Sequence, residues 1–176
     1  MTKNLTWAKE AFNRTTILLD NGQVVGQMQR EGVFDRDVDA HLNGVHLRFD
    51  VTGFIVHSVN IHDLSAGNQI IGHITFSFGK RAELQLATGE TYLWKRHNML
   101  MRDWDMIREG DEYTNDQNQE VVSYSLTRQF FVDHGDISVN TDSTTTPQPN
   151  ADVVVLAGLF IRNYFQRRRR AAVAAS

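Results

Sequence analysis

Four consecutive arginines, Arg167 to Arg170, form the densest group of like charges in the chain. Guanidinium groups bind phosphate oxygens well, and each positive charge near an anionic membrane contributes on the order of 1 kcal/mol to binding. The same residues at the carboxyl end of a helix would also be favoured by the helix dipole, without any ligand. We therefore treat Arg167, Arg168, Arg169 and Arg170 as a candidate contact for lipid headgroups, with a solvated helix end as the alternative.

Seven histidines are the side chains best suited to hold a metal ion. The closest pairs are His41 with His46 and His57 with His62, each five residues apart. On a single strand that spacing places the two side chains on opposite faces, so neither pair forms a natural chelate. His46 and His73 fall on the expected wet faces of their strands. We therefore expect no metal site and no cofactor, with the histidines in solvent or at a barrel mouth.

An acidic segment, DRDVDA, has the alternate spacing of ligands in calcium loops, with Asp35, Asp37 and Asp39. An EF-hand loop also needs Gly at its sixth position and Glu at its twelfth. Ala40 and His46 occupy those positions, so the pattern fails. The segment is predicted to be a solvated loop.

Enzymatic signatures are missing from the sequence. Without any cysteine there is no disulfide, no thiolate metal site and no cysteine nucleophile. No P-loop, nucleophile elbow, zincin pair or dinucleotide fingerprint is present. Dispersed residues such as His62, Asp63 and Arg81 could assemble a site, but no pattern singles them out. The sequence therefore predicts a protein that is not an enzyme.

Composition is typical of one globular domain: 176 residues with 41% hydrophobic side chains can bury a sizeable core. The net charge of −3 hides an asymmetry. Without the four consecutive arginines the chain has 14 basic and 21 acidic residues, which is a net charge of −7. Such an acidic body disfavours nucleic acid as a partner. The first ten residues lack the apolar stretch of a signal peptide, so we expect a cytoplasmic protein, peripheral to a membrane if the arginines bind lipid.

Strands are predicted from Thr15 to about Asn140, because apolar residues there recur mostly at every second position. In VHLRFD, for example, Val45, Leu47 and Phe49 alternate with polar residues. Many short strands with glycine turns between them predict an antiparallel sandwich or barrel. DRDVDAHLNG and REGDEYTNDQNQ are too polar for core strands and are predicted to be loops. The expected turns are Asn21-Gly22, Thr52-Gly53, Ala66-Gly67-Asn68, Thr88-Gly89, Gly110-Asp111 and Gly135-Asp136.

A proline-containing linker, Asn140 to Asn150, precedes the most apolar segment of the chain. Unbroken hydrophobicity after Asp152 predicts a helix over residues 152–166, capped by Asn150 or Asp152. Such a helix is about 22 Å long, shorter than the roughly 30 Å of a bilayer core. The arginine run would fall at or beyond its carboxyl end, and residues 171–176 are expected to form a disordered tail.

A helix that is apolar on all sides but too short to span a bilayer is usually buried in protein. A closed sheet can enclose it, and Gly158 would let one wall of that sheet approach closely. The alternative is a helix packed on one face of a sandwich. The expected core residues of the helix are Val153, Val154, Leu156, Gly158, Leu159, Phe160 and Ile161.

The order of these features resembles the tubby-like superfamily, which includes the tubby carboxyl-terminal domain, LURP-one-related proteins and phospholipid scramblases. The resemblance rests on LLDNGQVVG, IHDLSAGNQIIGHI, GKRAELQLATGETYLWKR, GDISVN and the terminal DVVVLAGLFIRNYF, in that order. It implies a mainly β fold, a closed antiparallel barrel of about twelve strands around a buried hydrophobic C-terminal helix, formed by residues 1–170 as one domain. The basic lipid pocket of tubby and the palmitoylated cysteines of scramblases have no counterpart that the sequence identifies.

Three functions follow from these observations. The first is a non-enzymatic cytoplasmic module that binds anionic lipid headgroups or a protein partner on its outer surface. The second is a tail-anchored, scramblase-like membrane protein that uses Val153 to Phe165 as its anchor. The third is a small-molecule carrier barrel, which a helix inside the barrel would disfavour because it occupies the ligand space.

Overall fold

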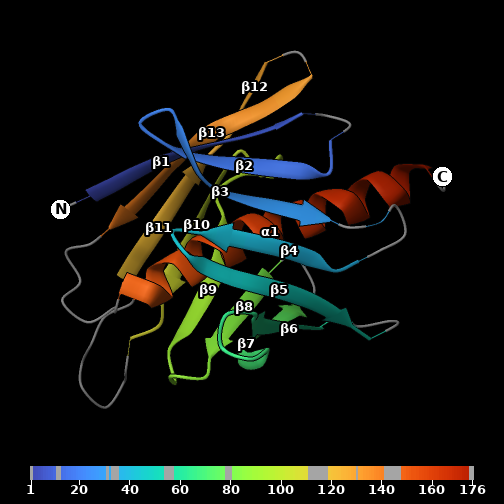
Figure 1. Cartoon of the computed structure of the whole chain (residues 1–176). Coiled ribbons are helices and arrows are strands. Elements are labelled where there is room, and N and C mark those ends of the chain that lie inside the picture. The colour runs from blue at the N-terminus through green and yellow to red at the C-terminus, as the bar shows by residue number, and fades with distance from the viewer. Residues whose placement is uncertain are drawn as a thin grey trace.

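The computed structural model describes residues 2–10, 13–30, 32, 36–53, 58–77, 81–110, 119–129, 131–140 and 148–174. Within these residues, one sheet of thirteen strands surrounds a single helix (Figure 1). The first strands are β1 (Thr2–Glu10), β2 (Thr15–Asp20), β3 (Gln23–Arg30), β4 (Val38–Leu42), β5 (Val45–Thr52), β6 (Ser58–Asp63) and β7 (Gln69–Ser77). Then follow β8 (Arg81–Leu86), β9 (Thr91–Arg96), β10 (Asp103–Arg108), β11 (Gln119–Ser125), β12 (Thr127–Gln129), β13 (Val132–Asn140) and helix α1 (Gln148–Ala174).

The sheet closes into a barrel because its first and last strands pair. β1 runs antiparallel to β13 along the whole strand, from Thr2 opposite Asn140 to Glu10 opposite Val132. From β1 to β11 each strand pairs with the next one in the chain, and β11 pairs with β13. Twelve strands therefore form the ring, as expected. The extra strand, β12, pairs with the part of β13 that β11 does not reach.

Alternation of buried and exposed side chains along each strand fills the barrel. In β5, Leu47 and Phe49 are fully buried while Arg48 faces outward. Arg48 forms a bidentate ion pair with Asp39 of β4, 2.7 Å from its Nε to Oδ1. The strands predicted from the period-two pattern are confirmed, and their inward-facing side chains are the buried ones.

Three of the six expected hairpin turns are confirmed among the described residues: Asn21-Gly22, Ala66-Gly67-Asn68 and Thr88-Gly89. The turn expected at Thr52-Gly53 continues into residues 54–57, which lie outside the described ranges. Asn21 and Gly22 both have positive φ, 49° and 81°, as the two central residues of a tight hairpin turn require. Gly53, Gly67 and Gly89 also have positive φ. Gly110-Asp111 is not fully described, because residues 111–118 lie outside the described ranges.

Gly135-Asp136 was predicted as a turn, and this prediction is wrong. Both residues lie inside β13, opposite Trp7 and Thr6 of β1. A Cβ at Gly135 would overlap the carbonyl oxygen of Ser125, so glycine is needed there for close approach of the backbone. Glycine in a sequence cannot by itself distinguish a turn from a crowded strand.

Two strands escaped the sequence analysis. β1 precedes Thr15, the first residue of the predicted strand region, yet it buries Leu5 and Trp7. The segment predicted as the loop DRDVDAHLNG contains β4, in which Val38, Ala40 and Leu42 point inward. Small or isolated apolar residues made both patterns weak. Asp35 of that segment and residues 111–118 of the second predicted loop lie outside the described residues.

Helix α1 is longer than predicted at both ends. It begins at Gln148, so neither Asn150 nor Asp152 caps it. Instead Asn150 donates to Glu90 at 2.6 Å, and Asp152 accepts from Asn43 at 3.0 Å. Residues 171–174 are helical and not a disordered tail, and the arginine run lies within the helix, because alanine and arginine both favour helix strongly.

The apolar part of α1 forms the core of the barrel. Phe160 stacks on Phe49 with ring centroids 4.5 Å apart, and Tyr164 stacks on Phe76 at 4.2 Å. A Cβ on Gly158 would overlap the Tyr124 hydroxyl, so the close approach expected at Gly158 is confirmed. All the predicted core residues are buried: Val153, Val154, Leu156, Gly158, Leu159, Phe160 and Ile161.

Among the described residues, no helix combines the length and the apolar character needed to cross a bilayer.

Candidate anion-binding site

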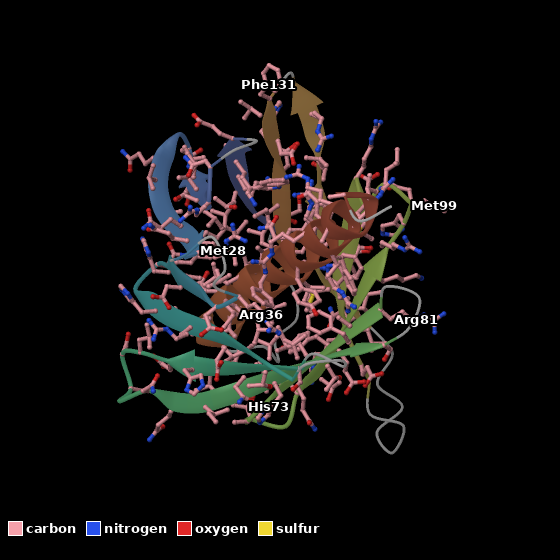
Figure 2. All side chains as sticks on the ribbon, turned by 90° about the vertical axis from the view of Figure 1, so that its right-hand side faces the viewer. Met28, Arg36, His73, Arg81, Met99 and Phe131 are labelled. Atoms are coloured by element: carbon pink, nitrogen blue, oxygen red, sulfur yellow. The ribbon has the colours of Figure 1, made fainter. Side chains whose placement is uncertain are left out.

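Barrel topology gathers basic side chains at one end. In an up-and-down barrel, successive connections lie alternately at the two ends. Those after β1, β3 and β9 share one end with the carboxyl half of α1, and Figure 2 looks onto it. We call it the arginine end, defined by the basic residues that line its two cavities: Lys9, Arg14, Arg30, Arg102, Arg128, Arg162, Arg167, Arg169 and Arg170.

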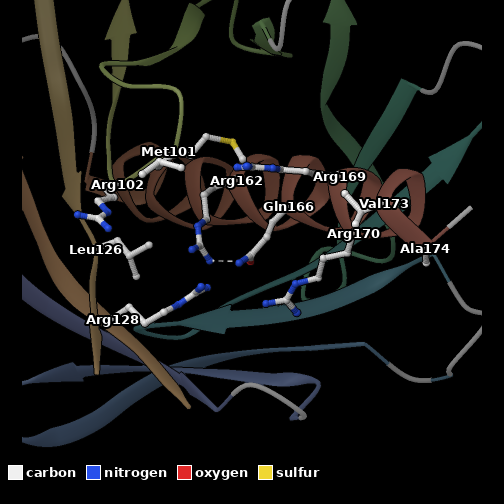
Figure 3. A pocket seen from close by; sticks show the side chains of 11 residues that line it. Met101, Arg102, Leu126, Arg128, Arg162, Gln166, Arg169, Arg170, Val173 and Ala174 are labelled. Carbon is white, nitrogen blue, oxygen red and sulfur yellow. Dashed lines mark hydrogen bonds between the residues drawn. The ribbon is translucent and has the colours of Figure 1, made fainter. Parts of the chain in front are cut away.

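The larger cavity, of about 450 Å³, lies between α1 and the connections on the β10 to β12 side (Figure 3). None of its described lining residues carries a carboxylate. Its basic lining is Arg102, Arg128, Arg162, Arg169 and Arg170, and its apolar lining includes Leu100, Met101, Leu126 and Val173. Guanidinium groups gathered in this way suit an anion with several oxygen acceptors. Two of the five, Arg128 and Arg162, are already paired with Asp133.

The smaller cavity, of about 170 Å³, lies on the other side of α1, against β1 to β4. Its polar lining is Lys9, Asn13, Arg14, Thr16, Arg30, Asn163, Arg167 and Arg170, and its apolar lining is Met28, Val38 and Phe160. Arg170 lines both cavities.

Helical spacing explains why one arginine run serves two cavities. Arg162, Gln166, Arg169 and Val173 follow one another at four, three and four residues, so they share one face of α1. Phe160, Asn163, Arg167 and Arg170 repeat at three, four and three residues, so they share a neighbouring face. The predicted headgroup contact is thus divided: Arg169 faces the larger cavity, Arg167 the smaller one. Arg168 lies over the Tyr164 ring, 5.9 Å from its centroid, and lines neither.

Arg162 forms the floor of the larger cavity. Its side chain is only 2% exposed, and Nη2 lies 3.3 Å from Oδ2 of Asp133. The guanidinium carbon lies 5.2 Å from the ring centre of Trp7 and 5.6 Å from that of Trp104, both cation–π distances. Nη1 also donates to Oε1 of Gln166 at 3.0 Å, the bond drawn in Figure 3. Packing and ion pairing together fix this cation in place.

Asp133 connects Arg162 to the cavity rim, because its Oδ1 accepts from Nε of Arg128 at 2.8 Å. Burial pushes the pKa of Asp133 upward, but the Arg128 hydrogen bond and the charge of Arg162 outweigh it, so the net pKa is lowered. Burial lowers the pKa of Arg162 from its ordinary value, and Asp133 opposes that change. The carboxylate is therefore ionised and committed to the two arginines.

Lys9 is a cation in the smaller cavity whose charge is disfavoured. Burial, followed by the charges of Arg162, Arg167 and Arg170, lowers its pKa from 10.5 to about 8. Burial and the nearby Arg30 also lower the pKa of Arg167. Among the described residues, the positive charge around this cavity thus exceeds what the carboxylate of Asp133 neutralises, and such an excess favours binding of an anion.

Replacing Lys9 with Met should raise the thermal unfolding midpoint at pH 7. A lysine whose pKa is lower in the folded state than its usual value of about 10.4 destabilises the fold at all pH values below the folded pKa. That penalty disappears as the pH rises from about 8 to about 10.4. The two proteins should therefore converge near pH 10, and a midpoint at pH 7 below that of the parent would contradict the electrostatic description.

The histidines that the structure describes do not gather into a metal site. The structure corrects the expected placement of His41 and His46: they lie opposite each other across the β4–β5 hairpin, with stacked rings 5.5 Å apart. The turn at Asn43-Gly44, which the sequence analysis overlooked, reverses the chain between them. His46 and His73 are exposed as expected, and His57 lies outside the described residues. No group of three or more metal-binding side chains occurs among the described residues.

The other residues considered for chemistry have structural partners or are far apart. Asp63 accepts backbone N–H bonds from Ser65 and Ala66 in a turn. His62 and Asp63 end β6 at one end of the barrel, whereas Arg81 begins β8 at the other.

A close hydrogen bond joins His97 to the buried Asp105. Burial raises the pKa of Asp105 above its usual value.

Sequence reasoning missed the basic residues outside the arginine run. Lys9, Arg14, Arg30 and Arg102 each lie within a few residues of a strand end, at alternate connections. Basic residues recurring at every second connection of an up-and-down barrel are the signal that could have found them.

Comparison with protein-family models, with curated proteins and with solved structures yields no match for this chain. The architecture and the arginine end are therefore the basis for any functional conclusion.

Proposed function

We propose that this chain is a non-enzymatic, cytoplasmic tubby-like module whose arginine end binds anionic phospholipid headgroups. A barrel closed around a hydrophobic carboxyl-terminal helix is the architecture that the tubby-like resemblance implies, and it supports the first part of the proposal. The second part rests chiefly on one observation. Among the described residues, the larger cavity is lined by five arginines and by no carboxylate.

The apolar rim favours a membrane over a soluble anion as the source of the phosphate. Met99 and Leu100, in the connection before β10, are 80% and 53% exposed, and Val173 near the end of α1 is 70% exposed. Leu100 and Val173 also line the cavity. Exposed large apolar side chains beside a basic cavity fit a bilayer surface. The apolar side chains would enter the headgroup region, and the basic cavity would hold the phosphate of a lipid.

The competing functions are less well supported. Side chains of α1 occupy the barrel interior, which removes the space that a carrier would use for its ligand. A tail anchor at Val153 to Phe165 would have to withdraw the core of the barrel. Both arguments favour a module that acts through its surface.

Binding to anionic vesicles should fall when two exposed arginines of the larger cavity are neutralised together, Arg102→Gln and Arg169→Gln. Two charges at about 1 kcal/mol each correspond to a loss of roughly thirtyfold in affinity. Cosedimentation with vesicles of phosphatidylcholine, alone and mixed with phosphatidylserine, measures this effect. Binding of the parent should need the anionic lipid and weaken with added salt.

The matched control removes two positive charges elsewhere on the surface, Lys3→Gln and Lys95→Gln. This variant should bind anionic vesicles nearly as well as the parent. Equal loss in both variants would reduce the effect to net charge, and no binding by the parent would end the lipid proposal. Thermal unfolding of each variant verifies that the fold is retained.

A further inference from the structure

The smaller cavity contains an amine whose surroundings suit covalent chemistry. Lys9 continues the inward-facing series Leu5 and Trp7 along β1, so its side chain points toward α1 at the barrel mouth. Buried Met28 and Phe160 are part of the cavity wall. The amine is thus held in a partly apolar cavity that opens to the surface.

Positive charge surrounds this amine on several sides. Among the described residues, the charged groups that face it come from each neighbouring element: Arg14 before β2, Arg30 on β3, Asp133 on β13, and Arg162, Arg167 and Arg170 on α1. Asp133 is the one acid of this set, and it is bonded to Arg128 and Arg162. Among the described residues, Lys9 has no ion-pair partner of its own. Guanidinium groups in this arrangement are suited to hold a phosphate.

An amine next to other cations in a desolvated site is a nucleophile at neutral pH. With a pKa of about 8, on the order of one fifth of Lys9 is neutral near pH 7.4, against about one in a thousand for an ordinary lysine. The neutral amine attacks carbonyl carbon, and the surrounding cations attract a carbonyl compound that carries negative charge.

We propose that the smaller cavity binds phosphorylated aldehydes and that Lys9 joins them as an imine. The guanidinium groups of Arg30, Arg167 and Arg170 hold the phosphate, and Nζ of Lys9 attacks the aldehyde carbon. A C–N bond forms while the C=O π bond breaks, and a proton lost by the amine nitrogen is taken up by the carbonyl oxygen to give the carbinolamine. The carbinolamine then loses its hydroxyl and the second N–H proton as water, which gives the imine. No oxidant or reductant takes part, and the reaction is reversible.

Pyridoxal 5′-phosphate is the probe for this site. The intact protein is incubated with it, reduced with borohydride to trap the imine, and digested for peptide mass spectrometry. Lys9 should be labelled at least tenfold faster than the other lysines of the chain, and inorganic phosphate should slow this labelling. Those internal comparators are Lys3, Lys80 and Lys95.

Two controls separate this site from general lysine reactivity. Pyridoxal, which lacks the phosphate, should label Lys9 at least tenfold more slowly than the phosphorylated probe. The double variant Arg30→Gln, Arg167→Gln should lose the phosphate preference while the Arg102→Gln, Arg169→Gln variant keeps it. Labelling of Lys9 no faster than of Lys3 and Lys95, or equal labelling by the two aldehydes, would overturn the proposal.

Discussion

A chain cut after Asn150 is expected not to fold. The cut removes the side chains of α1 that fill the barrel, among them Leu156, Leu159 and Ile161, each fully buried. Each large apolar side chain contributes about 1.5–3 kcal/mol by burial, while whole domains are stable by only about 5–15 kcal/mol. The strands alone could not offset that loss. A β-rich circular dichroism spectrum with a cooperative melt for residues 1–150 would contradict the barrel-around-helix structure.

One substitution should have nearly the same effect. Leu156→Asp places a carboxylate in the barrel core, where its charge has no partner and its protonated form still loses apolar contact. The matched control is Val173→Asp, the same kind of change on the same helix at a position that is 70% exposed. The control should unfold within about 1 kcal/mol of the parent in urea. Similar behaviour of the two variants would mean that Leu156 is not in the core.

Replacing Asp133 with Asn should cost about 3–5 kcal/mol of unfolding free energy. The substitution keeps the shape of the side chain but leaves the buried Arg162 cation without its counter-charge. Adding Arg162→Met should restore most of the stability, because Met fills space between Trp7 and Trp104 without requiring a partner. Urea unfolding of the two single variants and the double variant measures the coupling, and additive effects would show that the pair does not interact.

The same pair predicts a response to acid. The pKa of Asp133 is lower in the folded protein than its usual value of about 3.9, so its ionised form stabilises the fold above that pH. This contribution is lost as the pH falls through about 4 and below. The stability difference between the parent and Asp133→Asn should therefore be largest near neutral pH and shrink in acid. A difference that stays constant from neutral pH into acid would argue against an ionic role for Asp133.

Local patterns in the sequence predict most strands of the barrel wall and the apolar core of the helix, although they miss β1 and β4. Alternation in segments such as VHLRFD predicts strands because side chains of a strand point to opposite faces, and the hydrophobicity of residues 153–161 on all sides predicts a helix with no exposed face. Asn21-Gly22 adopts the predicted turn because it is one of the few dipeptides that accept positive φ at both positions. These features depend on neighbouring residues alone.

The candidate sites depend on the tertiary structure. Lys9, Arg30 and Arg128 are far apart in the chain and reach the same end of the barrel, beside α1, only because β1 pairs with β13 and α1 runs through the ring to that end. His41 and His46 share a face because a turn, not a continuous strand, separates them. The net charge of the chain did not indicate the arginine end, because a net charge does not say where in the fold the charged side chains lie. Closure of the barrel decides which strand ends are neighbours, and that depends on pairing between residues more than a hundred positions apart.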